Sequence, residues 1–62
     1  MDAPLQDRRI LVVDDDDDIR SGIVLALQFD GALLTEAADG NAAVEALLHD
    51  PPEAIVLDLM LP

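Results

Sequence analysis

Cysteine, tryptophan, tyrosine and lysine are all absent from this sequence of 62 residues, and phenylalanine occurs once. Without cysteine, the chain can form neither a disulfide framework nor a thiolate metal site. With Phe29 as its one aromatic side chain, it has little material for stacking on bases or for building an aromatic cage. The core must therefore be aliphatic, and no covalent cross-link compensates for the small size of the chain.

Positive charge is scarce as well. Three arginines are set against 14 acidic residues, and the formal net charge is -11. Such a segment repels phosphate backbones and anionic membrane surfaces, so we expect it to bind neither nucleic acid nor membrane. A basic protein surface or a divalent cation suits this charge better. No apolar run resembles a signal peptide or reaches the ~20 residues of a membrane span, and we predict a cytoplasmic protein.

Three short segments have the composition of β-strands. Residues 9–13 and 54–57 are uninterrupted β-branched and aliphatic runs, which are typical of strands buried on both faces of a parallel sheet. Residues 32–36 follow the turn signal of Asp30 and Gly31 and predict an edge strand.

Two helical patterns separate these strands. Apolar residues at helical spacing predict a helix from about residue 17 to residue 29, with aspartates in its first turn. A second helix is predicted to begin after a capping Asp39 and to end at the sequence Asp50-Pro51-Pro52. The order strand, helix, strand, helix, strand suits two crossover units and a parallel α/β sheet.

Two of the predicted strands end in acidic residues. Asp14 and Asp15 follow the first strand, and Asp58 follows the third. Because the carboxyl ends of adjacent parallel strands meet at one edge of a sheet, we expect these carboxylates to lie close together. Like charges ~4 Å apart repel by about 4 kcal/mol at an effective dielectric constant of ~20, so a hard cation such as Mg2+ is predicted there. Residues 16–18 are explained more simply as the loop and first turn of the following helix.

Three blocks of the sequence, RRILVVDDDDDIR, TEAADGNAAVEALL and PPEAIVLDLMLP, resemble the start of the receiver domain of bacterial two-component response regulators. The resemblance covers residues 8–62. It implies an incomplete flavodoxin-like, doubly wound parallel sheet of the form β-α-β-α-β, with strand order 2-1-3. It also implies a signalling switch rather than a metabolic enzyme, partnered by a sensor histidine kinase or a phosphotransfer protein.

The resemblance also implies roles for particular residues. Asp58 corresponds to the aspartate that accepts a phosphoryl group from a phosphohistidine. Asp14 and Asp15 correspond to the acid pair that helps to hold Mg2+, together with Asp58 and the backbone carbonyl of Met60. Pro62 corresponds to the proline of the loop that follows the phosphoacceptor.

The family pattern includes further site residues, which follow a fourth and a fifth strand. It includes a Ser or Thr after a fourth strand and a Lys after a fifth, which meet the phosphoryl oxygens. We therefore expect residues 9–62 to be the amino-terminal half of a receiver domain, preceded by an extension at residues 1–8, and to be inactive alone. The edge of the third strand is then expected to be open to the other half of the domain or to another copy.

Two alternatives stay open. The chain can be a truncated receiver that acts only as a protein-pairing module through its third strand. A phosphatase of the haloacid dehalogenase type also places two acids after a strand, as Asp15 and Asp17 stand, but its pattern does not predict the third block. An EF-hand loop that begins at Asp14 is excluded, because Ile19 and Leu25 occupy the positions that require Gly and Glu.

Two basic residues are given no chemical role. His49 stands alone near a helix end and is predicted to be a surface residue. Arg20 can reach back to the aspartates, but a helix arginine beside such residues usually forms a weak surface pair worth ~0 to 1 kcal/mol.

Overall fold

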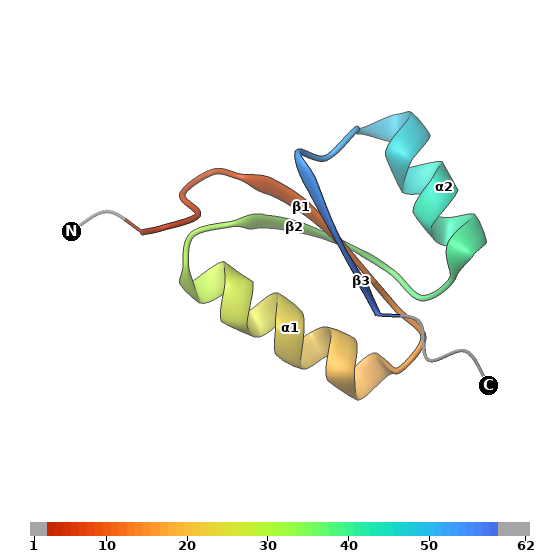
Figure 1. Cartoon of the computed structure of the whole chain (residues 1–62), viewed down its shortest axis with the longest axis horizontal. Coiled ribbons are helices and arrows are strands. Elements are labelled where there is room, and N and C mark those ends of the chain that lie inside the picture. The colour runs from red at the N-terminus through yellow and green to blue at the C-terminus, as the bar shows by residue number, and fades with distance from the viewer. Residues whose placement is uncertain (1–2, 59–62) are drawn as a thin grey trace.

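Three parallel strands lie between two helices in the computed structural model, which describes residues 3–58 (Figure 1). The sheet has the order β2-β1-β3, and Figure 1 shows the two helices on opposite sides of it. The elements in chain order are β1 (Arg9–Asp14), α1 (Asp17–Phe29), β2 (Leu33–Ala37), α2 (Gly40–His49) and β3 (Ala54–Asp58). The predicted incomplete flavodoxin-like fold, with strand order 2-1-3, is confirmed.

The central strand β1 supplies most of the core. Leu11, Val12 and Val13 are each no more than 1% exposed, as the uninterrupted apolar run predicts. Alternate residues of β1 point to opposite faces of the sheet. The hydrophobic cluster between the sheet and α1, here called the α1-face core, contains the buried residues Ile10, Val12, Val24 and Ala32. The cluster between the sheet and α2, the α2-face core, contains the buried residues Leu11, Val13 and Ala37.

Both helices begin at the aspartates that the sequence indicates. The side chain of Asp16 caps α1 by accepting hydrogen bonds from the backbone N–H groups of Asp18 and Ile19, at 2.9 and 3.0 Å. Asp39 caps α2 by accepting one from the N–H of Ala42 at 2.8 Å. The carboxylates of residues 16–18 are thus explained by the helix start, as predicted.

The segment before β1 is tied to the turn between α1 and β2. The backbone N–H of Leu5 donates to the carbonyl of Asp30 at 2.9 Å, and that of Asp7 donates to the carbonyl of Gly31 at 3.0 Å. Gly31 has a φ of +93°, and a Cβ atom there would lie 2.8 Å from the side chain of Gln6. Leu5 packs against the α1-face core. A boundary that separates residues 1–8 from the domain stays a prediction.

The third strand differs from its expected environment. Its apolar run predicts burial on both faces, yet Ile55 is 49% exposed and Leu57 is 63% exposed. Only Val56 packs against the α1-face core. The reason is that both helices pack on β1 and β2, and within residues 3–58 no strand pairs with the outer edge of β3. The expected open edge is therefore present in the described part of the chain.

Ion pairs join the start of β1 to the connection between α2 and β3, at the end of the sheet opposite the strand-end aspartates. Arg8 lies 3.0 Å from Glu53, and Arg9 lies 3.1 Å from Asp50. The backbone N–H of Arg9 also donates to Glu53 at 3.3 Å. This hydrogen bond, followed by that from Arg8, lowers the pKa of Glu53 from its ordinary value of 4.5.

Truncation of a leucine in β1 should destabilise the domain strongly. In the complete domain, Leu11→Ala is expected to lower the free energy of unfolding by about 2 to 5 kcal/mol, because the fully buried side chain leaves a cavity. The control Leu48→Ala removes the same atoms from a side chain that is 82% exposed, and should change that free energy by less than about 0.5 kcal/mol. Urea unfolding measures both, and equal losses would contradict the described core.

Glu53 should make part of the stability depend on pH. Because its pKa is lowered in the folded state, its contribution is present above the ordinary pKa and is lost as pH falls through the lowered one. The difference in free energy of unfolding between the wild type and Glu53→Gln should therefore shrink on going from about pH 7 to about pH 3. Urea unfolding at several pH values tests this, with Glu45→Gln on the exposed surface of α2 as the matched control. A constant difference would show that the ionisation of Glu53 has no effect on stability.

Candidate functional site

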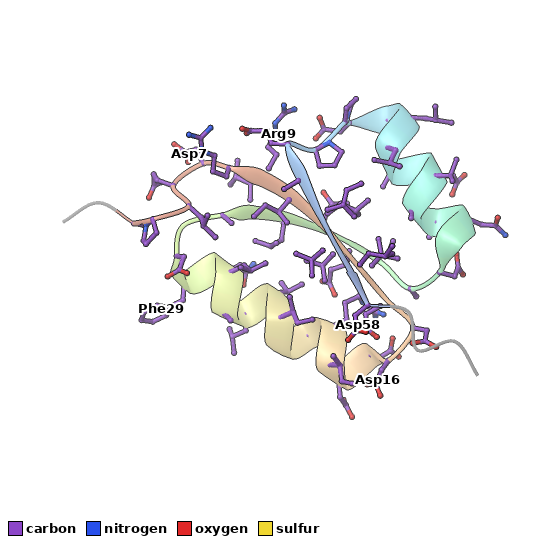
Figure 2. All side chains as sticks on the ribbon, in the orientation of Figure 1. Asp7, Arg9, Asp16, Phe29 and Asp58 are labelled. Carbon is purple, nitrogen blue, oxygen red and sulfur yellow. The ribbon has the colours of Figure 1, made fainter. Side chains whose placement is uncertain are left out.

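Aspartates end the two adjacent strands β1 and β3. The register places Asp14 opposite Asp58, on strands that lie about 4.8 Å apart. Val12 and Val56, two residues earlier in each strand, both pack in the α1-face core. Because side chains two residues apart share a face, both aspartates lie on the α1 side of the sheet. Figure 2 shows Asp58 at the same end of the molecule as Asp16, close to the start of α1.

Asp14 is a buried carboxylate that is only half satisfied. Its side chain is 1% exposed. One carboxylate oxygen, Oδ1, accepts a hydrogen bond from the backbone N–H of Asp16 at 2.8 Å. The other oxygen, Oδ2, is buried and has no hydrogen-bond partner among the described residues. A buried carboxylate oxygen without a partner is costly, and a bound cation removes that cost, so the residue fits a metal site.

The other predicted site residues are arranged less tightly. Asp15 lies in the bend after β1 and is exposed, and Asp58 is exposed as well. Among residues 3–58, no three His, Cys, Asp or Glu side chains form a compact metal-binding group. The backbone carbonyl of Met60 and the predicted loop residue Pro62 lie outside the described residues. The structure thus pairs Asp14 with Asp58 by register and places Asp15 next to Asp14 in the chain.

Arg20 is neither weakly paired nor exposed, contrary to the prediction from the sequence. The side chain is only 13% exposed and donates three hydrogen bonds. Nη1 donates to the backbone carbonyl of Asp14 at 2.7 Å, Nη2 to the carboxylate of Asp17 at 2.6 Å, and Nε to that of Glu36 at 3.1 Å. The hydrogen bond with Asp17 is the main cause of a raised pKa for Arg20, and partial burial opposes it. The three-residue spacing from Asp17 is a sequence signal for one contact, but no local pattern indicates the other two.

His49 is the last residue of α2 and is exposed, as predicted. It lines an open hollow of about 600 Å3 beside α2, together with residues that include Thr35 of β2 and Leu48. None of the strand-end aspartates lines this hollow, so it is separate from the candidate site. In the described part of the chain, neither helix is long and apolar enough to cross a membrane.

A parallel α/β sheet with aspartates paired at the carboxyl ends of adjacent strands is the class of fold and site that the structure defines. The family model described as the response regulator receiver domain matches residues 10–62. The chain therefore belongs to the family of receiver domains of two-component response regulators. The predicted family is confirmed, and it is a family of signalling domains.

Several relatives are response regulators named MprA. The chain is 46% identical over 54 residues to MprA of Mycobacterium ulcerans. It is 44% identical over 54 residues to MprA of Mycolicibacterium vanbaalenii and to that of Mycobacterium avium. The aligned part is 87% of this chain in all three cases, but only 23 to 24% of each relative. The chain thus spans about a quarter of the length of the curated relatives it matches, and no solved structure matches it.

Proposed function

We propose that this chain is the phosphoacceptor part of a receiver domain, in which Asp58 accepts a phosphoryl group from the phosphohistidine of a sensor histidine kinase or phosphotransfer protein. The observation that carries the proposal is the pairing of Asp58 with Asp14 at the carboxyl ends of β1 and β3. Asp58 is exposed and open to a phosphodonor, whereas Asp14 is buried. The net charge of -11 favours a donor with a basic docking surface, and we place the protein in the cytoplasm.

The proposed reaction is a substitution at phosphorus. A carboxylate oxygen of Asp58 attacks the phosphorus in line with the P–N bond of the phosphohistidine. The new O–P bond forms as the P–N bond breaks, and the electron pair of that bond returns to the imidazole nitrogen, which leaves as neutral imidazole because the other ring nitrogen carries a proton. The products are an aspartyl phosphate and the free histidine of the donor. The strand holds the nucleophile at the edge of the sheet, which reduces the loss of freedom needed to align it with phosphorus.

Asp14, Asp15 and Asp58 would hold Mg2+, together with the backbone carbonyl of Met60. Mg2+ prefers carboxylate and carbonyl oxygens, and the unpartnered Oδ2 of Asp14 supports its placement here. When bound, Mg2+ neutralises negative charge on the transferring phosphoryl oxygens. The part played by the chain is to keep two strand-end carboxylates on one face of the sheet, next to a third in the following bend.

A second candidate function is protein pairing through β3. The exposed side chains of Ile55 and Leu57 support it, since natural sheets usually cover or charge an apolar edge strand. The other half of a receiver domain or another copy of the chain would cover this strand. Phosphotransfer and pairing are compatible if the covering segment completes the domain.

Phosphorylation of the complete protein tests the assignment of Asp58. Incubation with a phosphorylated sensor kinase or a small phosphodonor should label the wild type, and Asp58→Asn should abolish the label because the nucleophilic oxygen is replaced. The control Asp18→Asn makes the same substitution in the exposed first turn of α1 and should keep the label. A label that persists in Asp58→Asn would show that another residue is the acceptor. No label on the wild type would favour the pairing function.

Mg2+ binding to the complete protein tests the acid pair. Asp15→Asn is expected to weaken the affinity for Mg2+ by about tenfold or more, because it removes a charged oxygen ligand. Asp18→Asn removes the same charge a short distance along the chain and should have a much smaller effect. Titration calorimetry measures both, and equal affinities in the wild type and Asp15→Asn would contradict the proposed site.

A further inference from the structure

The three hydrogen bonds of Arg20 connect three different elements. The acceptors are the carbonyl of Asp14 at the end of β1, the carboxylate of Asp17 in the first turn of α1, and the carboxylate of Glu36 in β2. The backbone of Arg20 is fixed as well, because its N–H donates to the carbonyl of Asp16 at 2.9 Å. Arg20 thus links the ends of β1 and β2 to the start of α1.

These contacts fix the backbone on both sides of Asp15. The peptide group before Asp15 contains the carbonyl of Asp14, which accepts from Arg20 at 2.7 Å. The peptide group after Asp15 contains the N–H of Asp16, which donates to the carboxylate of Asp14 at 2.8 Å. With both flanking peptide groups held, the direction in which the side chain of Asp15 leaves the backbone is set. The loss of either bond would free the bend.

We propose that Arg20 is a positioning residue of the acid site, which holds the bend that carries Asp15 against Glu36 of β2 and so directs the Asp15 carboxylate toward the cation. This inference rests on the proposed function of that site. Three of the five guanidinium N–H groups are engaged by protein acceptors, so Arg20 is not arranged to bind phosphoryl oxygens. A lysine would keep the charge but would lose the planar fork that reaches three acceptors at once.

Charge and positioning predict opposite effects of Arg20 on a bound cation. A guanidinium near a cation site repels the cation, so removal of its charge alone would tighten Mg2+ binding. Removal of a group that positions a ligand would weaken binding instead. The sign of the change in affinity therefore separates the two roles.

The test uses calorimetric Mg2+ titration of the complete protein and of four variants. Arg20→Met removes the charge and the fork, and Arg20→Lys removes only the fork, so both should weaken Mg2+ binding by about tenfold. Glu36→Gln should weaken it less, because the amide oxygen of glutamine can still accept from Nε and the other two hydrogen bonds of Arg20 are unchanged. The control Arg8→Met breaks an ion pair of 3.0 Å at the opposite end of the sheet and should leave the affinity unchanged. Hydrogen exchange at the amides of Asp15 and Asp16 should be faster in both Arg20 variants.

Several outcomes would overturn the inference. Mg2+ binding by Arg20→Met that equals or exceeds that of the wild type would do so, as would full affinity in Arg20→Lys. If the wild type binds Mg2+ and the Arg20 variants bind it with the same affinity, the role of Arg20 is refuted and the proposed function stays intact. No Mg2+ binding by the wild type would refute the proposed metal site instead, and the exchange rates would still report on the bend. If Arg20→Met does not fold, as urea unfolding would show, Arg20→Lys and Glu36→Gln decide.

Discussion

The burial of β1 on both faces is the constraint on which the rest of the structure depends. Because Leu11, Val12 and Val13 need cover on both sides, each face of the sheet must carry a helix. The chain meets this need by reversing direction across β1: it moves from β1 to β2, then returns past β1 to β3. Right-handed crossovers in opposite directions put their helices on opposite faces. The same reversal brings the carboxyl ends of β1 and β3 together, where open α/β sheets bind their ligands.

Most of the fold could be predicted because its signals are local. The apolar run of β1 and the capping residue Asp39 act through their immediate neighbours, and each has the predicted role. The sequence predicts Asp16 only as part of the loop and first turn of α1, whereas in the structure it caps that helix. The environment of β3 could not be predicted in this way. Its apolar run indicates a strand suited to burial, but burial depends on what packs against the strand. In the described residues no helix covers β3, so Ile55 and Leu57 stay exposed.

The candidate site was predictable to a similar extent. The positions of Asp14 and Asp58 at strand ends follow from the sequence, and their adjacency follows from the strand order. The contacts of Arg20 do not, because they depend on the strand register. That register pairs Glu36 with Val12 and so brings the end of β2 near the start of α1. A residue that seems a weak surface pair in the sequence therefore becomes a link between three elements.

The three arginines of the chain are all engaged by acceptors other than the strand-end carboxylates of Asp14 and Asp58. The chain has three arginines and no lysine. Arg8 and Arg9 pair with acids at the opposite end of the sheet, and Arg20 is engaged by three acceptors of its own. Phosphorylation of Asp58 would add a charge of about -2 beside carboxylates that already repel one another. A cation that shifts the phosphorylation equilibrium toward the phosphorylated state by a given factor must bind that state more tightly than the unmodified state by the same factor. In the proposed function, metal binding and phosphorylation at these strand ends would therefore be thermodynamically coupled.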